Sequence, residues 1–303
     1  MNNRVILIAG PTASGKSSLA LRLAEKTGGT IINADSMQVY SELQLLSARP
    51  SAADLDRAPH LLYGFRAGNL DYSVQHWIED VAAIMRTEPL ASGPAIIVGG
   101  TGLYFSALTG GLSPVPEIDP EIRGKWRTEQ RQAAAADLHR QLADRDPLAA
   151  AQIRESDSQR IVRALEVFDS TGKSLIIWQQ QAGTPLVKIE GAVAVQLQPA
   201  RDWLHQRINH RFEQMVADGA LAEVQQLRQL AYADDSPVMK AIGVAELTAL
   251  IDGELSEAQA IERAAARTRQ YAKRQYTWLR NQLSVGWTVA SDPQSAAETL
   301  LNL

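Results

Sequence analysis

The sequence has 303 residues, of which 45% are hydrophobic, and its formal net charge at pH 7 is −4. This length suits one large domain or two smaller ones, and the charge gives no global indication of a nucleic-acid partner. Because the chain has no cysteine, disulfides, thiolate zinc sites and a cysteine nucleophile are excluded. We find no charged and apolar leader and no apolar run as long as a membrane span, so we expect a cytoplasmic protein without a membrane partner.

The first predicted strand, Val5–Ala9, leads into a glycine-rich loop of the kind that binds nucleotides or other phosphate compounds. Residues 10–17 follow the pattern G-x-x-x-x-G-K-[ST], and apolar residues with helical spacing come next. In this context backbone N–H groups converge on an anion and the helix N-terminus adds positive charge, whereas an ordinary glycine turn is the weaker alternative. Lys16 would add a full charge and Ser17 would bind Mg²⁺, the cofactor we expect. The predicted phosphate ligands are Gly10, Pro11, Thr12, Ala13, Ser14, Gly15, Lys16 and Ser17.

Further strands and a helix follow in the first third of the chain. Apolar runs at residues 30–34, 61–65 and 95–98 have the length of buried strands. Residues 73–86 carry apolar side chains at helical spacing. Strands that are apolar on both faces and alternate with helices indicate an α/β fold with a parallel sheet covered on both sides.

The rest of the chain is predicted to be mainly helical. A breaker at residues 112–116 precedes residues 120–180, which are rich in Ala, Arg, Gln and Asp at helical spacing. Strands are expected at 193–197 and 287–290, and long helices at 202–217, 219–231, 238–251 and 256–283. We therefore predict three parts: 1–112 as the first part of the core, 113–190 as a helical insertion, and 191–303 as the return to the core with long basic helices.

Two further segments are predicted to lie beside the phosphate loop. Asp35 follows the second strand, and Thr101 lies in a glycine turn after the strand at 95–98. The carboxyl ends of parallel strands form the ligand crevice, so both should face it. Asp35 could bind Mg²⁺ through water or act as a general base, although a helix N-cap is an equally common role for such an acid. The glycine turn lacks the acid that an ATP-hydrolysing motor needs, and it fits a hydroxyl that grips a phosphate oxygen.

Basic residues gather in the last long predicted helix. From Arg263 to Arg280 the chain has six of them and no acid: Arg263, Arg267, Arg269, Lys273, Arg274 and Arg280. A local basic surface on a mildly acidic protein can still attract nucleic acid.

The motifs together resemble one family. In order, they are GPTASGKS at residues 10–17, DSMQVY at 35–40, VGGTGLY at 98–104, DSQRIVRALEV at 157–167 and KRQYTWLR at 273–280. These blocks resemble the tRNA dimethylallyltransferases, also called isopentenyl-diphosphate:tRNA transferases. The resemblance implies a P-loop NTPase-like core with an insertion that reaches the tRNA anticodon loop. It also implies transfer of the dimethylallyl group of dimethylallyl diphosphate to N6 of the adenosine 3′-adjacent to the anticodon, by an enzyme that we expect to be monomeric.

The residues can then be given roles. Asp35 would be the general base, Thr101 would bind the bridging oxygen of the leaving group, and Lys16 and Arg211 would bind the diphosphate. Gln38 would read the flipped adenine, since an amide can both donate and accept. The predicted tRNA contacts are Asp35, Ser36, Met37, Gln38, Thr101, Arg123, Gln159, Arg160, Ile161, Val162, Arg163, Lys240, Gly243, Lys273, Arg274, Gln275, Trp278 and Arg280.

Two positions depart from the family pattern, and two other functions stay open. Arg49 stands where the family usually has Lys, and Val244 stands where it usually has Tyr, which could remove a surface that stacks on RNA. A P-loop kinase for a small molecule or nucleoside would use ATP in the same loop. An RNA-binding ATPase regulator without transfer activity is the other alternative.

Overall fold

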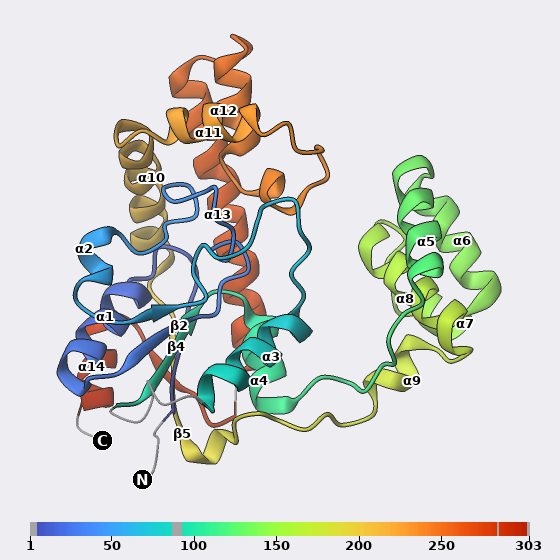
Figure 1. Ribbon diagram of the computed structural model, residues 1–303, viewed down its shortest axis with the longest axis horizontal. Helices are drawn as coiled ribbons and strands as arrows, with labels where there is room; N and C mark the ends of the chain where they lie inside the picture. The colour runs from blue at the N-terminus through green and yellow to red at the C-terminus, as the bar shows by residue number, and fades with distance from the viewer. Residues whose placement is uncertain (1–4, 87–92, 284, 302–303) are drawn as a thin grey trace. The chain divides into compact units, whose positions relative to one another are not determined.

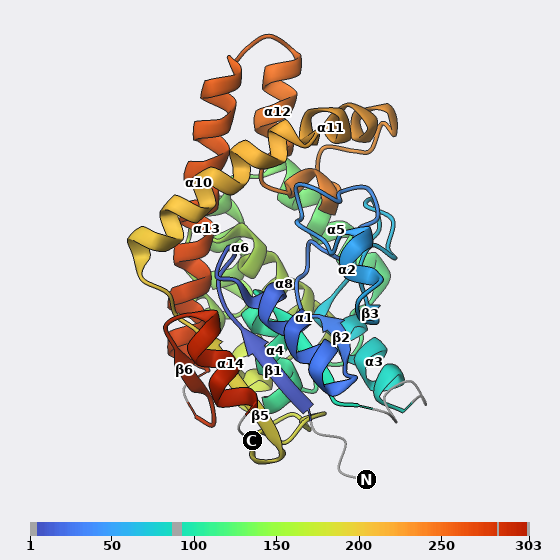
Figure 2. The same cartoon turned by 90° about the vertical axis from the view of Figure 1, so that its left-hand side faces the viewer.

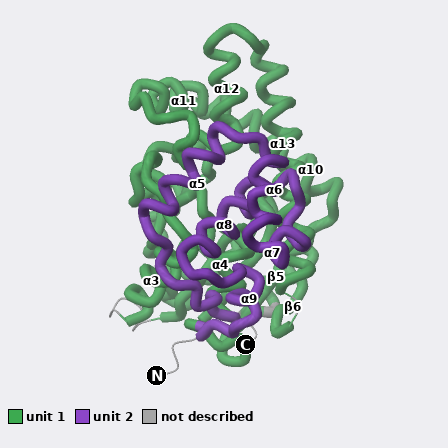
Figure 3. The backbone as a smooth tube through the Cα atoms, turned by 90° about the vertical axis from the view of Figure 1, so that its right-hand side faces the viewer, with its two compact units in different colours: residues 1–109, 186–303 green, residues 110–185 purple. Residues whose placement is uncertain are grey.

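The computed structural model describes residues 5–86, 93–283 and 285–301. The chain divides into two compact units, one of residues 1–109 and 186–303 and the other of residues 110–185 (Figure 3). Among the described residues, no helix is long and apolar enough to cross a membrane.

The larger unit is built on a sheet of six parallel strands in the order β3-β2-β4-β1-β5-β6. Figure 1 labels three of them, β2, β4 and β5. The central strand pairs Leu7 with Ile97 on one side and with Ala194 on the other. All carboxyl ends therefore meet at one edge, which we call the carboxyl edge. The strands are β1 (Val5–Ala9), β2 (Thr30–Asn33), β3 (His60–Leu61), β4 (Ala95–Gly99), β5 (Ala192–Leu197) and β6 (Thr288–Ala290).

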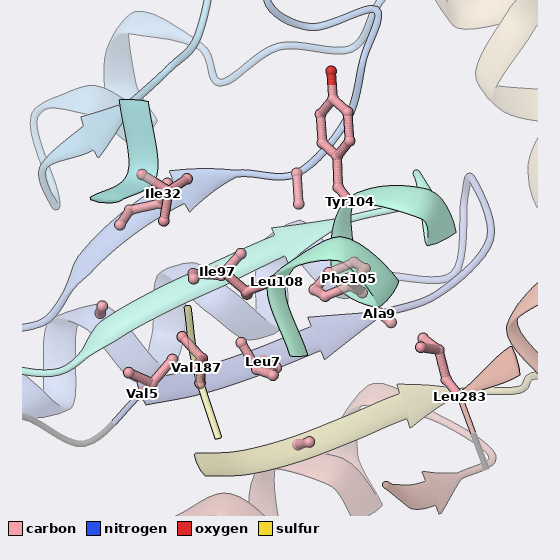
Figure 4. Close-up of a cluster of buried hydrophobic side chains, with 14 of the residues drawn as sticks. Val5, Leu7, Ala9, Ile32, Ile97, Tyr104, Phe105, Leu108, Val187 and Leu283 are labelled. Carbon is pink, nitrogen blue, oxygen red and sulfur yellow. The ribbon is translucent and has the colours of Figure 1, made fainter. Parts of the chain in front are cut away.

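Helices cover both faces of this sheet because each strand is apolar on both sides. Helices α1 and α14 lie side by side on one face, where Leu19, Leu23 and Ala296 are buried (Figure 2). Helices α3 and α4 cover the other face, where Phe105 and Leu108 pack on Leu7 (Figure 4). The helices of this unit are α1 (Lys16–Thr27), α2 (Ala52–Leu55), α3 (Val74–Met85), α4 (Gly102–Gly110), α10 (Arg201–Ala217), α11 (Ala220–Gln229), α12 (Val244–Ile251), α13 (Glu257–Gln282) and α14 (Pro293–Leu301).

The smaller unit is helical and has its own core. Trp126 is fully buried there, and its indole N–H donates to Asp169 at 2.9 Å, so the large side chain leaves no unpaired donor. Leu138 and Leu165 are also fully buried in this core. The helices are α5 (Pro120–Gln132), α6 (Ala135–Arg145), α7 (Pro147–Ala150), α8 (Ser158–Thr171) and α9 (Leu175–Gln179).

The predicted fold class is confirmed, but several boundaries were wrong. The strand expected at 61–65 ends at Leu61, because Leu62 and Gly64 have φ of 64° and 57° and turn the chain. The helix expected at 238–251 is divided into a short 3-10 helix, η3 (Pro237–Lys240), and α12, with Gly243 at φ 103° between them. A second 3-10 helix, η2 (Ile189–Gly191), precedes β5.

Local patterns also missed three helices, α2, α4 and α14, and the insertion has different limits. Helix α2 has only four residues, and α4 begins inside the glycine turn that we had assigned wholly to the site. The smaller unit spans 110–185 rather than 113–190. Val187 explains its end, because it donates a backbone hydrogen bond to Leu108 at 3.0 Å and is buried in the core of the larger unit.

Candidate active site

The phosphate loop is a tight backbone curl between β1 and α1. Ala13 and Gly15 have φ of 64° and 88°, and the Ser14 N–H donates to Pro11 O at 3.2 Å. A Cβ at Gly10 would lie 2.8 Å from Ser14 Oγ, so glycine is required there. Ser14 is fully buried, and its hydroxyl has no hydrogen-bond partner among the described residues. An unpaired buried hydroxyl is costly unless a ligand uses it, which fits a loop that closes around an anion.

Lys16 begins helix α1 and lies close to the loop backbone. Its ammonium donates to Pro11 O at 3.2 Å. Burial lowers the Lys16 pKa to about 8, Asp35 opposes this by favouring the charged form, and Arg211 adds to the lowering. Lys16 is therefore still mostly charged at neutral pH, and a negatively charged ligand would stabilise its charged form further.

Helix α10 brings two arginines to the loop. Arg211 Nη2 donates to Thr12 Oγ1 at 2.7 Å, and Arg207 Nε donates to Ala13 O at 3.1 Å. Burial lowers the Arg211 pKa, while Asp35 raises it. The structure thus brings the predicted Arg211 to the loop and adds Arg207, which the sequence analysis missed. The spacing of four residues, which places both on one helix face, was the available signal.

Asp35 lies at the carboxyl edge of β2 and is held by its neighbours. Its N–H donates to the side chain of the fully buried Asn33 at 2.8 Å, and Asn33 Nδ2 donates back to Asp35 O at 2.9 Å. The Met37 N–H donates to Asp35 Oδ1 at 3.0 Å. This contact fixes one carboxylate oxygen and so orients the other.

Thr101 lies beside this segment. Its Oγ1 accepts a hydrogen bond from the Ser36 N–H at 3.0 Å, and its own N–H donates to Ala34 O at 3.2 Å. Gly99 permits this approach, because a Cβ there would lie 2.0 Å from Ala34 O. The Thr101 hydroxyl uses a lone pair for Ser36 N–H, and its proton points to Ser36 Oγ at 3.3 Å, a long contact that a ligand oxygen could replace.

The comparisons with known proteins agree with this arrangement. Residues 38–282 match the family model described as IPP transferase, and residues 3–63 match one described as isopentenyl transferase. The chain belongs to the IPP transferase family. A tRNA dimethylallyltransferase of Chelativorans sp. (strain BNC1) is 53% identical over 281 residues, which are 93% of this chain and 96% of that protein.

Solved structures of the family share the fold. A tRNA isopentenylpyrophosphate transferase from Bacillus halodurans superposes with a TM-score of 0.69 at 29% identity, over 99% of this chain and 95% of that one. A eukaryotic dimethylallyltransferase described as acting on tRNA has a TM-score of 0.81 at 25% identity, over 98% of this chain and 76% of that one. The resemblance and the P-loop NTPase-like core predicted from the sequence blocks are therefore confirmed, and the kinase alternative is disfavoured.

Gln275 is not a surface residue of this IPP transferase family member, contrary to the prediction that it contacts tRNA. It is buried, its Nε2 donates to Gly100 O at 3.0 Å, and its Oε1 accepts from the Thr12 N–H at 2.8 Å. The side chain therefore connects the phosphate loop to the glycine turn. Trp278, one turn later, is half-buried against Gly102, where an added Cβ would lie 2.0 Å from a ring atom.

Gln38 was expected both to donate to and to accept from a base. Its Nε2 instead donates to Ser47 O at 2.8 Å and to Ala48 O at 2.9 Å. Both amide protons are used within the protein, so the expectation of a donor was wrong. Gln38 lines a cavity of about 480 Å³ that also reaches Ser17 of the phosphate loop.

The predicted tRNA block of the smaller unit mixes surface and core residues. Ile161 and Val162 are buried among the helices of that unit, so their side chains are not available to RNA as predicted. Gln159, Arg160 and Arg163 are exposed on the same helix. A further candidate, Arg123 of α5, is half-exposed. Arg160 lies 3.5 Å from Asp157 and Arg163 lies 3.4 Å from Glu166, both within one helical turn.

The basic residues of α13 do not share one face. Lys273 and Arg280 are seven residues apart and nearly aligned, whereas Arg274 is turned about 100° away, towards Tyr271. Lys273 lines a groove of about 290 Å³ with three other basic residues: Arg201, His205 and Arg269. All three predicted tRNA contacts, Lys273, Arg274 and Arg280, are exposed.

The remaining predicted positions have mixed surroundings. Lys240 is exposed at the end of η3, and Gly243 is buried at its left-handed turn. Val244 is 1% exposed and packs with Val39 and Leu43, so its difference from the family pattern changes the core rather than a surface that stacks on RNA.

Arg49, the other position that departs from the family pattern, stabilises the loop of residues 41–49. Its Nη2 donates to Ser41 O at 3.1 Å, and a Cβ on Gly64 would collide with its guanidinium. Burial lowers the Arg49 pKa, and Glu223 and Glu42 oppose this.

Ser17 is the residue of the phosphate loop that was predicted to hold a metal ion. Among the described residues, no group of three or more His, Cys, Asp or Glu could bind a metal ion. Ser17 is exposed at the second residue of α1. Mg²⁺ usually keeps several waters and takes few protein ligands together with substrate phosphate oxygens, so a single hydroxyl fits that ion.

Proposed function

We propose that this protein transfers the dimethylallyl group of dimethylallyl diphosphate to N6 of the adenosine 3′-adjacent to the anticodon of a tRNA. One observation carries the proposal: at the carboxyl edge, a phosphate loop with three cations lies near the Asp35 carboxylate and the Thr101 hydroxyl, which accepts a hydrogen bond from the Ser36 N–H next to Asp35. The cations bind the diphosphate leaving group. The carboxylate accepts the proton as the N–C bond forms, and the hydroxyl donates a hydrogen bond as the C–O bond breaks. Membership of the IPP transferase family supports the same reaction.

Asp35 serves the bond that forms. The exocyclic amine of adenine is a weak nucleophile, because its lone pair is delocalised into the ring. As N6 attacks the allylic carbon, its proton passes to the Asp35 carboxylate, which Met37 and Asn33 hold in place. The base must leave its stack to reach this edge, as in other enzymes that modify a base.

The phosphate loop and Thr101 serve the bond that breaks. The C–O bond electrons pass to the bridging oxygen of the diphosphate, where Thr101 can donate its proton as a hydrogen bond. Lys16 and Arg211 neutralise the other oxygens from fixed positions on α1 and α10. Ser17 would hold Mg²⁺, which when bound adds charge neutralisation on the diphosphate.

The partners and state of the enzyme are part of the proposal. The exposed residues of α8, Gln159, Arg160 and Arg163, are proposed to contact the anticodon stem-loop. We also propose that the protein acts as a monomer and that it acts in the cytoplasm, where a tRNA substrate is available. Light scattering at the assay concentration tests whether the protein is a monomer.

Labelled dimethylallyl diphosphate, incubated with the protein, Mg²⁺ and unmodified tRNA, tests the reaction. Label on the tRNA is expected. ATP-dependent phosphorylation of a small molecule or nucleoside without label on tRNA would support the kinase alternative. Tight tRNA binding with neither reaction would support a binding protein and contradict the proposal.

Thr101→Ala is expected to lower the single-turnover rate constant roughly ten- to a hundredfold, with a smaller change in diphosphate affinity. The hydroxyl matters most when the C–O bond breaks, so the loss belongs to the chemical step. Thr101→Ser is the matched control, because it keeps the hydroxyl that accepts from Ser36 and should retain most of the rate. A variant that loses only diphosphate affinity would contradict the role assigned to Thr101.

Neutralising Lys273, Arg274 and Arg280 together is expected to weaken stem-loop binding. Counterion release predicts a shallower dependence of log affinity on log salt, by up to about 0.9 for each lost phosphate contact. The double variant of Lys273 and Arg280 and the single variant of Arg274 separate the two helix faces. Titration at several salt concentrations measures the slope, and an unchanged slope in the triple variant would show that α13 does not hold RNA.

A further inference from the structure

A turn at residues 44–48 is held by a carboxylate from helix α11. Glu223, in the first turn of that helix, accepts hydrogen bonds from three successive backbone N–H groups: Gln44, Leu45 at 2.8 Å and Leu46 at 3.0 Å. Hydrogen bonds to an ionised acceptor are stronger than neutral ones, and a concave run of N–H groups favours an anion. Glu223 therefore fixes the backbone of this turn.

The end of the same turn orients the Gln38 side chain. Ser47 O and Ala48 O both accept from Gln38 Nε2, at 2.8 and 2.9 Å. The opposite orientation of the amide would place its oxygen against two carbonyl oxygens, which is repulsive, so the contacts decide the assignment. With both N–H groups used, only Oε1 is left for a ligand, and it can only accept.

Gln38 is placed where such an acceptor could meet a base. Its backbone N–H donates to Asp35 O at 3.3 Å, so it follows the proposed general base within one turn. It is half-buried and lines the cavity that reaches Ser17. Adenine carries an amino donor at position 6, whereas inosine carries a carbonyl oxygen there. An amide that can only accept favours the amino group and repels the carbonyl.

We propose that Glu223 is a positioning residue for base specificity. By holding the 44–48 turn, it keeps the Gln38 amide in the orientation that accepts from an amino group. Glu223 acts on Gln38 through the backbone of this turn. The inference rests on the proposed function, since it takes adenosine in RNA as the substrate.

The test compares the binding of two anticodon stem-loops that differ only in adenosine or inosine at the target position. The wild type is expected to bind the adenosine form about tenfold more tightly, the size of one good base-edge contact. In Glu223→Ala the turn is released and the amide can rotate to donate, so the ratio should fall to about two or less. Glu213→Ala is the matched control, because Glu213 is a 60%-exposed acid on α10, and the ratio should not change.

A Glu223→Ala protein that keeps the wild-type ratio would overturn the inference, even if both stem-loops bound more weakly. A wild-type ratio near one would overturn it as well. If Glu223→Ala does not fold, the adenosine-to-inosine affinity ratio is measured in Glu223→Gln instead. The amide keeps the size of the side chain but loses the charge that stabilises the three N–H groups, so the same fall in the ratio is expected. Transfer to the adenosine stem-loop is measured separately, so the failure of the proposed reaction is distinguishable from the failure of this binding ratio.

Discussion

Asp35→Asn is expected to lower the rate constant for prenyl transfer about a hundredfold or more at saturating tRNA. The amide oxygen can still accept from the Met37 N–H, as Oδ1 does now at 3.0 Å, so the local backbone should persist. The amide cannot take the proton of the attacking amine. Single-turnover transfer of label, with the tRNA affinity measured in parallel, checks both expectations.

The comparison needs one precaution and one control. Asp35 favours the charged form of Lys16, so its loss lowers the Lys16 pKa further, and the assay belongs on the acid side of the wild-type value of about 8. Asp56→Asn, at the exposed C-terminal cap of α2, removes one surface carboxylate and should leave the rate unchanged. A rate near that of the wild type in Asp35→Asn would remove Asp35 from the role of base.

The position of the site at the carboxyl edge could be predicted, because it depends on short sequence motifs and on the parallel order of the strands. Strand, glycine loop and helix follow each other directly, and parallel strands bring the segments after β2 and β4 to one edge. The contact of Ser36 N–H with Thr101 Oγ1, 65 residues away, is the result. The phosphate loop and the convergence of these two segments could both be inferred without knowing any long-range side-chain contact.

The supports of the site could not be predicted in this way. Gln275 reaches Thr12 across 263 residues, and Glu223 reaches Gln44 across 179, so no local pattern signals either contact. Gln275 was predicted to contact tRNA because a sequence block does not distinguish residues that bind a ligand from residues that hold the loop. The apolar side chains of Ile161 and Val162 were the available signal for burial, since α8 is buried from Ile161 to Val167 except at Arg163.

Lys16→Ala is expected to impair both diphosphate binding and transfer, because the lysine charge meets the ligand in the ground state and in the transition state. We expect affinity to fall at least tenfold, the loss of one charge-assisted hydrogen bond to a phosphate oxygen. Lys26→Ala, which removes an exposed lysine from the last turn of the same helix, is the matched control and should bind normally. Calorimetric titration with dimethylallyl diphosphate measures the affinity.

The pH dependence of binding gives Lys16 a signature that a structural defect would not share. The free enzyme has a Lys16 pKa of about 8, so the ammonium is present below that pH and is lost above it. A bound diphosphate favours the charged form, so binding takes up a proton above pH 8 and the affinity should fall about tenfold for each pH unit there. In Lys16→Ala this slope should vanish while the residual affinity stays flat. An equal slope in the variant would assign the titration to another group and contradict the role of Lys16 as the titrating ligand of the diphosphate.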